Sequence, residues 1–110
     1  MKVNSDLMRG VAEPIILSLL SNKKMYGYEI IKVVNEKTNN AFQWKEGTLY
    51  PCLHRLEAAK LIKSEWQIAE NGKPRKYYTL TNKGVNALAE KKEEWNLFAK
   101  SVNVLLSAAI

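Results

Sequence analysis

EGTLYPCLHRLEAAKLI, residues 46–62, is the stretch that decides the fold. Placed on a helix, its apolar side chains fall within one arc, which contains Leu49, Cys52, Leu53 and Leu56. The opposite arc is small, polar and basic; it contains Gly47, Pro51, His54, Arg55 and Ala58, with Thr48 and Tyr50 at its edges. Such a helix buries one face in a core and offers hydrogen bonds on the other, which suits the base edges of a DNA major groove. Taken alone, the pattern also describes a surface helix whose polar side faces water.

Two shorter helices are predicted before this stretch. Pro14 fits the first turn of a helix, so the first is expected from about residue 13 to 21, after an N-terminal arm over residues 1–11. Tyr26-Gly27-Tyr28 opens the second helix, and Thr38-Asn39-Asn40 ends it. The third begins at Glu46 or Gly47, because a proline deep inside a helix costs about 3 kcal/mol. This is the order of a helix-turn-helix.

Residues 62–80 predict a β-hairpin. The first strand, residues 62–68, alternates in the manner of a half-buried strand, with one face made of Ile62, Ser64, Trp66 and Ile68. Asn71-Gly72 favours a tight turn before a second strand over residues 75–80. Three cations lie at or beside the tip: Lys73, Arg75 and Lys76. Their mutual repulsion is relieved by a phosphate backbone, so the hairpin is interpreted as the wing of a winged helix; a merely solvated hairpin is the alternative.

A long last helix is predicted from Thr81, a good N-cap, to the chain end. Its heptad positions are Val85, Leu88, Lys92, Trp95, Ala99, Val102, Leu106 and Ala109, widened by Phe98 and Leu105. All but Lys92 are apolar, and Lys92 either sets the register or extends its charge to water. Because a short chain cannot easily wrap such a helix, we expect it to pair with a second copy alongside the N-terminal arm.

Composition limits the possible functions. The chain has 110 residues, 46% of them hydrophobic, and a net charge of +6, which indicates one small folded domain with polyanions as plausible partners. Residues 45–80 carry seven Lys or Arg against four Asp or Glu. The excess of positive charge therefore lies in the predicted DNA-contacting helix and the hairpin that follows it. The single cysteine, Cys52, excludes an intrachain disulfide and is interpreted as a core residue in a reducing compartment. With no secretory signal and no apolar run that could cross a bilayer, a cytoplasmic location is expected.

The ordered motifs resemble the PadR-like winged-helix transcriptional regulators. The matching segments span roughly residues 12–90: YGYEI at 26–30, GTLYP at 47–51, LHRLE at 53–57, LI at 61–62 and RKYYTLT at 75–81. Cys52 and His54 stand where the family often has other residues. The resemblance implies a dimeric repressor that binds a palindromic operator and is released by a small aromatic effector. The single C-terminal helix resembles the short branch of the family, in whose multidrug-sensing members a tryptophan lines a pore between subunits; Trp95 occupies a comparable place.

The expected fold class is mainly α with a small β-hairpin (α+β). Residues 1–80 form a winged helix-turn-helix, and residues 81–110 form a dimerisation helix. The expected DNA contacts are Lys45, Thr48, Tyr50, His54, Arg55, Lys73, Arg75 and Lys76. Arg55 either reads guanine or holds a phosphate, and Tyr50 is either a groove contact or a packing residue. The expected dimer contacts are Leu7, Met8, Leu88, Trp95, Ala99, Val102 and Leu106.

Trp95 and Phe98 are also the candidate effector site, since two symmetry-related indoles flank a slot for a small aromatic or planar cationic molecule. The equal alternative is that Trp95 is a packing anchor of the dimer. No catalytic group is recognised, because the one histidine, His54, has no acidic partner. A metal site of Cys52 and His54 is not expected, because residues two apart on a helix point in different directions. No glycine-rich loop for a cofactor phosphate is present in the sequence. We therefore expect a transcriptional regulator that binds double-stranded DNA, not an enzyme. The alternatives are a winged helix that binds an acidic protein and a small-molecule carrier.

Overall fold

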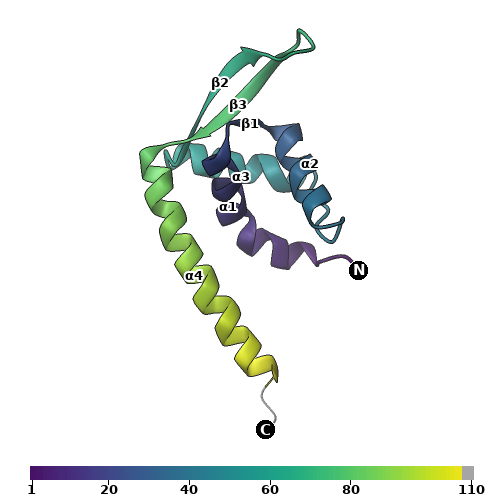
Figure 1. Ribbon diagram of the computed structural model, residues 1–110, viewed down its shortest axis with the longest axis vertical. Helices are drawn as coiled ribbons and strands as arrows, with labels where there is room; N and C mark the ends of the chain where they lie inside the picture. Colours follow the sequence, from purple (N-terminus) through teal and green to yellow (C-terminus); the bar gives the residue numbers. More distant parts are fainter. Residues whose placement is uncertain (108–110) are drawn as a thin grey trace.

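The computed structural model describes residues 1–107. Its elements are α1 (Ser5–Asn22), β1 (Met25–Tyr26), α2 (Gly27–Lys37), α3 (Glu46–Ala58), β2 (Ile62–Ile68), β3 (Pro74–Leu80) and α4 (Asn82–Ser107). The three strands form one antiparallel sheet in the order β1-β3-β2. The hairpin β2–β3 and the long α4 extend in opposite directions from the cluster of α1, α2 and α3 (Figure 1). The expected α+β class with a winged helix and a long last helix is confirmed. Ala109, the last predicted heptad position, lies outside the described residues.

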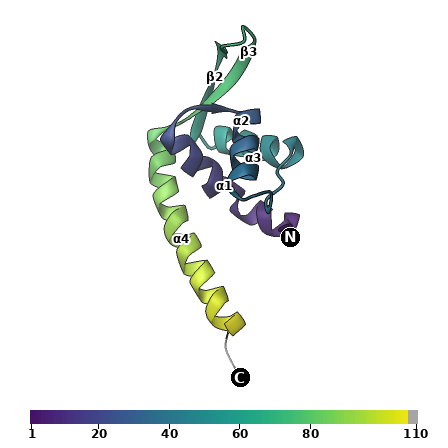
Figure 2. The ribbon, with the colours of Figure 1, turned by 45° about the vertical axis from the view of Figure 1, so that its right-hand side comes forward.

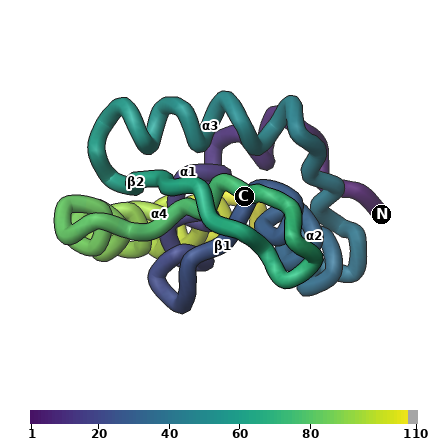
Figure 3. Tube along the Cα trace, turned by 90° about the horizontal axis from the view of Figure 1, so that it is seen from above, coloured from purple at the N-terminus to yellow at the C-terminus, as the bar shows by residue number. Residues whose placement is uncertain are grey.

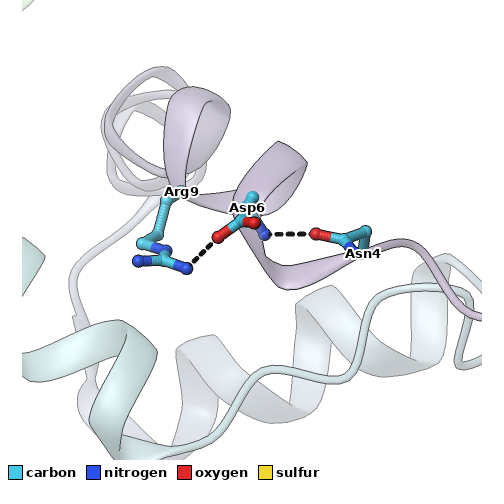
Figure 4. Close-up of polar contacts among 3 residues, drawn as sticks. All are labelled: Asn4, Asp6 and Arg9. Carbon is cyan, nitrogen blue, oxygen red and sulfur yellow. Dashed lines mark hydrogen bonds and ion pairs between the residues drawn. The ribbon is translucent and has the colours of Figure 1, made fainter.

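Helix α1 begins eight residues earlier than the sequence predicted. The segment expected as an arm forms its first turns, and Pro14 lies inside the helix instead of in its first turn. Asn4 caps the helix, because its side-chain oxygen accepts a hydrogen bond from the amide of Asp6 at 2.8 Å. Asp6 also pairs with Arg9 one turn later (Figure 4). The polar residues that were interpreted as an N-terminal arm therefore include the cap and the first turn of α1.

Helix α2 begins and ends where the sequence predicted. Its end is fixed by Asn39 and Asn40, which adopt positive φ angles of 50° and 63°. The side chain of Asn35 then holds the connector to α3: it donates to the carbonyl of Trp44 at 3.1 Å and accepts from the amide of Trp44 at 2.8 Å. The Trp44 ring is buried, with 2% of its surface exposed. This clamp sets where α3 starts.

The core lies between the helices and the inner end of the sheet. The predicted inward arc of α3, Leu49, Cys52, Leu53 and Leu56, is fully buried. It packs with apolar residues of α1 and α2, which include Ile16, Leu17, Leu20, Ile30 and Val34. Removing this apolar surface from water is the main term that holds the three helices together.

The hairpin has the predicted strands and turn, with Ile62 opposite Leu80 and Trp66 opposite Lys76. Gly72 at the turn has a φ of +81°, a backbone conformation that favours glycine. The expected half-buried face is wrong for its outer part, because Trp66 is 68% exposed and Ile68 72%. The hairpin extends beyond the helices (Figures 1 and 2), and within residues 1–107 most of the surface of these two side chains stays uncovered. The two-residue strand β1, which pairs with Tyr77 and Tyr78, was not predicted.

Helix α4 begins at the predicted cap. The Thr81 hydroxyl oxygen accepts from the amide of Gly84 at 3.0 Å, and it also lies 2.7 Å from the carbonyl oxygen of Lys60, to which it can donate. Gly84 allows a close approach to the link between α3 and β2, since a Cβ there would lie 2.1 Å from the carbonyl oxygen of Leu61. Beyond this joint, Leu88 is the last buried side chain of α4 among the described residues. The helix then runs free of the hairpin, alongside α1 and past it (Figure 2).

Candidate nucleic-acid interface

The outer face of α3 is open. Its small and polar residues are exposed, as the sequence predicted: Gly47, Pro51, His54, Arg55 and Ala58. Seen from above, α3 lies along one edge of the molecule (Figure 3). The buried arc on the other side anchors the helix, so this face is presented to a partner in a fixed orientation.

Lys45, His54 and Arg55 are exposed on or beside α3, and Thr48 is half-buried at the edge of the open face. The structure thus gathers four of the predicted DNA contacts on α3 and its N-cap. Cys52 does not join them, because it points into the core with 1% of its surface exposed. Burial raises the pKa of its thiol to about 11, so the thiol stays protonated and is a core group, not a nucleophile.

Tyr50 is half-buried against the start of α2. A Cβ on Gly27 would lie 2.3 Å from the hydroxyl oxygen of Tyr50, so only glycine allows the ring to lie there. The packing role of Tyr50 is therefore visible within the single chain. Its contact with DNA stays a prediction. Tyr50 lines a cleft between α2 and the hairpin, so its ring is not enclosed in the core.

The cations of the wing, the hairpin β2–β3, do not all project freely. Lys73 is exposed at the tip, whereas Arg75 and Lys76 are half-buried. The guanidinium of Arg75 lies 4.4 Å from the ring centroid of Tyr26, and the ammonium of Lys76 lies 5.8 Å from that of Tyr78. These cation–π contacts hold two positive charges against the outer half of the wing and β1 instead of leaving them free at the tip.

The base of the wing is fixed by contacts that sequence reasoning missed. Tyr26 of β1 meets Tyr77 of β3 edge-to-face, with ring centroids 5.4 Å apart. Lys24 donates to the side chain of Gln67 at 2.6 Å and lies 5.4 Å from the Tyr77 ring. Only the pairing of β1 with β3 brings these residues together, and a two-residue strand leaves no periodic signal in the sequence.

A second candidate site lies between α1 and α4. This groove, the α1–α4 groove, has a volume of about 630 Å³, and Trp95 and Phe98 line it together, with ring centroids 5.7 Å apart. The two predicted effector residues are thus neighbours. Other lining residues were not predicted: the ring of Phe42, the carboxylates of Asp6, Glu13 and Glu94, and the ammonium of Lys91.

The predicted dimer contacts divide into two groups. Met8 and Leu88 are buried within the single chain, with 5% and 7% of their surfaces exposed, because they pack in its own core. Leu7, Trp95 and Leu106 are exposed, and Ala99 and Val102 are half-buried. The open part of the predicted seam is therefore the outer half of α4 with the start of α1.

Comparison with known proteins agrees with this geometry. The profile of the transcriptional regulator PadR-like family matches residues 16–90. Uncharacterized protein X of Lysinibacillus sphaericus is 43% identical over 93 residues, which cover 84% of this chain and 85% of that protein. A transcriptional regulator from Clostridium thermocellum has a similar structure, with a TM-score of 0.81 and 43% identity over 89% of this chain and 95% of that one. A PadR-like transcriptional regulator from Bacillus cereus gives 0.81 and 35% identity over 94% and 99%.

The matched region contains α2, α3 and the wing, and it ends in the first turns of α4. Members of this family are transcriptional regulators that bind DNA, and they are not enzymes. No helix within residues 1–107 has the length and apolar character needed to cross a membrane. The chain belongs to the PadR-like family of transcriptional regulators.

Proposed function

We propose that this regulator is a homodimeric repressor that binds an inverted-repeat operator and is released by a small planar aromatic effector. The observation that carries the proposal is the uncovered apolar side of α4. Leu105 is 74% exposed and Leu106 80%, on a helix that already follows a heptad pattern. A second copy of α4 would cover this surface, as in other paired helices.

The dimer would set the spacing of the two α3 helices. Dimeric helix-turn-helix proteins place their reading helices in successive major grooves, about 34 Å apart, so the operator mirrors the twofold symmetry. On this proposal Thr48, His54 and Arg55 face the base edges, with Lys45 and Tyr50 beside them. Lys73, Arg75 and Lys76 of the wing contact the phosphate backbone, which makes binding strongly dependent on salt.

The effector would bind where Trp95 and Phe98 line the α1–α4 groove. Two aromatic rings favour a planar apolar molecule, and three lining carboxylates against one ammonium favour a cationic one. The groove borders both α1 and α4, so a bound effector would favour a different arrangement of the two winged-helix regions of the dimer. Operator affinity then falls by a shift of population.

The test is a mobility shift with the DNA upstream of the protein's own gene against a scrambled duplex, repeated with a panel of planar cationic dyes and phenolic acids. We expect a preference for the upstream DNA and release by at least one cationic dye. No preference over the scrambled duplex would favour a winged helix that binds protein. Quenching of tryptophan fluorescence by a dye without any loss of DNA affinity would favour a carrier.

Trp95→Ala tests the effector site separately. We expect this variant to bind the operator as the wild type does and to need a much higher dye concentration for release. Phe42→Leu, which changes another ring of the same groove, is the matched control for a general loss of apolar lining. A full effector response in Trp95→Ala would contradict the placement of the site.

A further inference from the structure

A second cleft, the wing cleft, lies between the wing and the beginning of α2. It has a volume of about 280 Å³, and its walls include Tyr28 of α2, Tyr50 of α3, and Trp66, Arg75 and Lys76 of the wing. On this side the outer part of β3 has no neighbouring strand, because β1 pairs only with Tyr77 and Tyr78. The cleft is therefore an open channel along a strand edge, and α3 borders it through Tyr50.

The wing cleft carries positive charge and no negative charge. Arg75 and Lys76 line it, and no carboxylate does. Within residues 1–107 the ion pairs are Arg9–Asp6 and Lys23–Glu29, so neither lining cation is neutralised by a carboxylate of its own chain. Each cation instead lies against a tyrosine ring, which leaves it available to an anion. An anionic occupant is what this charge distribution favours.

Two aromatic side chains that line the wing cleft are largely exposed to solvent. Tyr28 is 63% exposed and Trp66 is 68% exposed, although both belong to regular elements. Neither was predicted as a DNA contact. An exposed ring beside a channel of positive charge offers an apolar face to a sugar, and the tyrosine adds a hydroxyl donor.

We infer that the wing cleft binds the sugar–phosphate backbone of one DNA strand, with Trp66 packing on a deoxyribose and the Tyr28 hydroxyl donating to a phosphate oxygen. Arg75 and Lys76 supply the charge at the same phosphates. The inference rests on the proposed placement of α3 in the major groove, since a strand that borders the groove then runs between α3 and the wing. Contacts of this kind fix the position of the protein on the duplex without reading its sequence.

The test needs no operator, because backbone contacts form on any duplex. The full chain is titrated against a fluorescein-labelled random duplex of about two helical turns, and the affinity is measured by anisotropy over a series of salt concentrations. We expect Trp66→Ala to weaken binding about tenfold and Tyr28→Phe about threefold, from lost packing and a lost hydrogen bond. Neither change should alter the salt slope, because no cation is removed. Lys76→Gln should reduce the slope by about 0.9 per chain.

Ile68→Ala is the matched control, because Ile68 is equally exposed on the same face of the wing and does not line the cleft. It should bind within about twofold of the wild type. Duplex should also quench tryptophan emission in the wild type and not in Trp66→Phe. Thermal unfolding of each variant checks that the fold is unchanged.

The inference is overturned if Trp66→Ala and Tyr28→Phe bind as the wild type does, or if Ile68→Ala is as weak as Trp66→Ala. In both cases the wild type still binds DNA, so the proposed function stands. If the wild type binds neither the random duplex nor the upstream DNA, the proposed function fails and the inference fails with it.

Discussion

Helices α3 and α4 are both amphipathic, yet they use their apolar faces differently. In α3 every large apolar residue of the inward arc is buried, and Leu49, Leu53 and Leu56 are each 0% exposed. In α4 the largest apolar residues of the outer half are open, with Leu97 at 68% and Leu106 at 80%. The chain therefore covers the core of the winged head, residues 5–80, by itself, and we propose that a second copy covers the open part of α4. Exposed apolar surface on this scale usually marks an interaction site.

The α1–α4 groove and the wing cleft also differ in charge. The α1–α4 groove has three carboxylates and one ammonium in its walls, whereas the wing cleft has two cations and no carboxylate. Their opposite charges fit a cationic ligand in the α1–α4 groove and a polyanion in the wing cleft. One small chain thus separates the two proposed binding functions by electrostatics as well as by distance along the fold.

The largest expected effect is on stability, and it should differ between the winged head and the outer half of α4. Leu53→Ala removes a fully buried side chain of α3 and should lower the free energy of unfolding by about 3 kcal/mol. Leu105→Ala, the matched change on exposed α4, should cost under about 0.5 kcal/mol at low chain concentration. Urea unfolding followed by circular dichroism measures both. Equal losses in the two variants would mean that α4 is packed within its own chain.

The next effect concerns association. Leu106→Asp places a charge on the open side of α4 and should raise the dimer dissociation constant by about tenfold or more. Sedimentation velocity over a range of concentrations measures it. Asn103→Asp adds the same charge to an exposed position outside the predicted seam and serves as control. A dimer that survives Leu106→Asp unchanged would move the interface elsewhere.

Within the head, α3 should specify the sequence and the wing should not. Arg55→Gln should weaken operator binding about tenfold and reduce the preference over random DNA. Lys73→Gln should weaken binding to every duplex alike and reduce the salt slope by about 0.9 per chain. Lys100→Gln, on exposed α4, controls for loss of net charge. If Arg55→Gln weakens operator and random duplexes equally, Arg55 holds a phosphate and reads no base.

The last effect is alkaline destabilisation through the core of the head. The folded thiol of Cys52 keeps its proton up to about pH 11, whereas an exposed thiol ionises near the ordinary value of 9.0. The unfolded chain therefore loses this proton first, so stability present below pH 9 falls as the pH rises toward 11. Cys52→Ala should lose less stability than the wild type between about pH 8 and about pH 10.5, as measured by urea unfolding. Tyr78, whose pKa burial also raises, contributes to both proteins alike.

The sequence predicted most of the head, because its elements leave periodic signals. The arc of α3, the limits of α2, the turn at Asn71-Gly72 and the cap at Thr81 were all recognised from residue type and spacing. What it missed depends on contacts between distant segments: the strand β1, the Asn35 clamp on Trp44, and the exposure of Trp66 beyond the core. The start of α1 was missed for another reason, since the polar residues before residue 13 were interpreted as an arm, whereas Asn4 caps the helix and Asp6 lies in its first turn.

The candidate sites were predicted unevenly. Residue type and helix face were enough to place His54 and Arg55 on the open side of α3, because a helix fixes which side chains share a face. They were not enough to show that Met8 and Leu88 belong to the core of the single chain, since a heptad position does not say which surface covers it. Glu13 and Phe42 line the same groove as Trp95 only because segments that are distant in the sequence pack together, which no local pattern encodes.

The central claim is that two chains, joined through α4, place two α3 helices on one operator. Sedimentation of the protein with a duplex carrying the inverted repeat, and with a duplex carrying one half-site, tests it most directly. We predict two chains on the full repeat and much weaker binding to the half-site. One chain bound to either duplex with equal affinity would contradict the account.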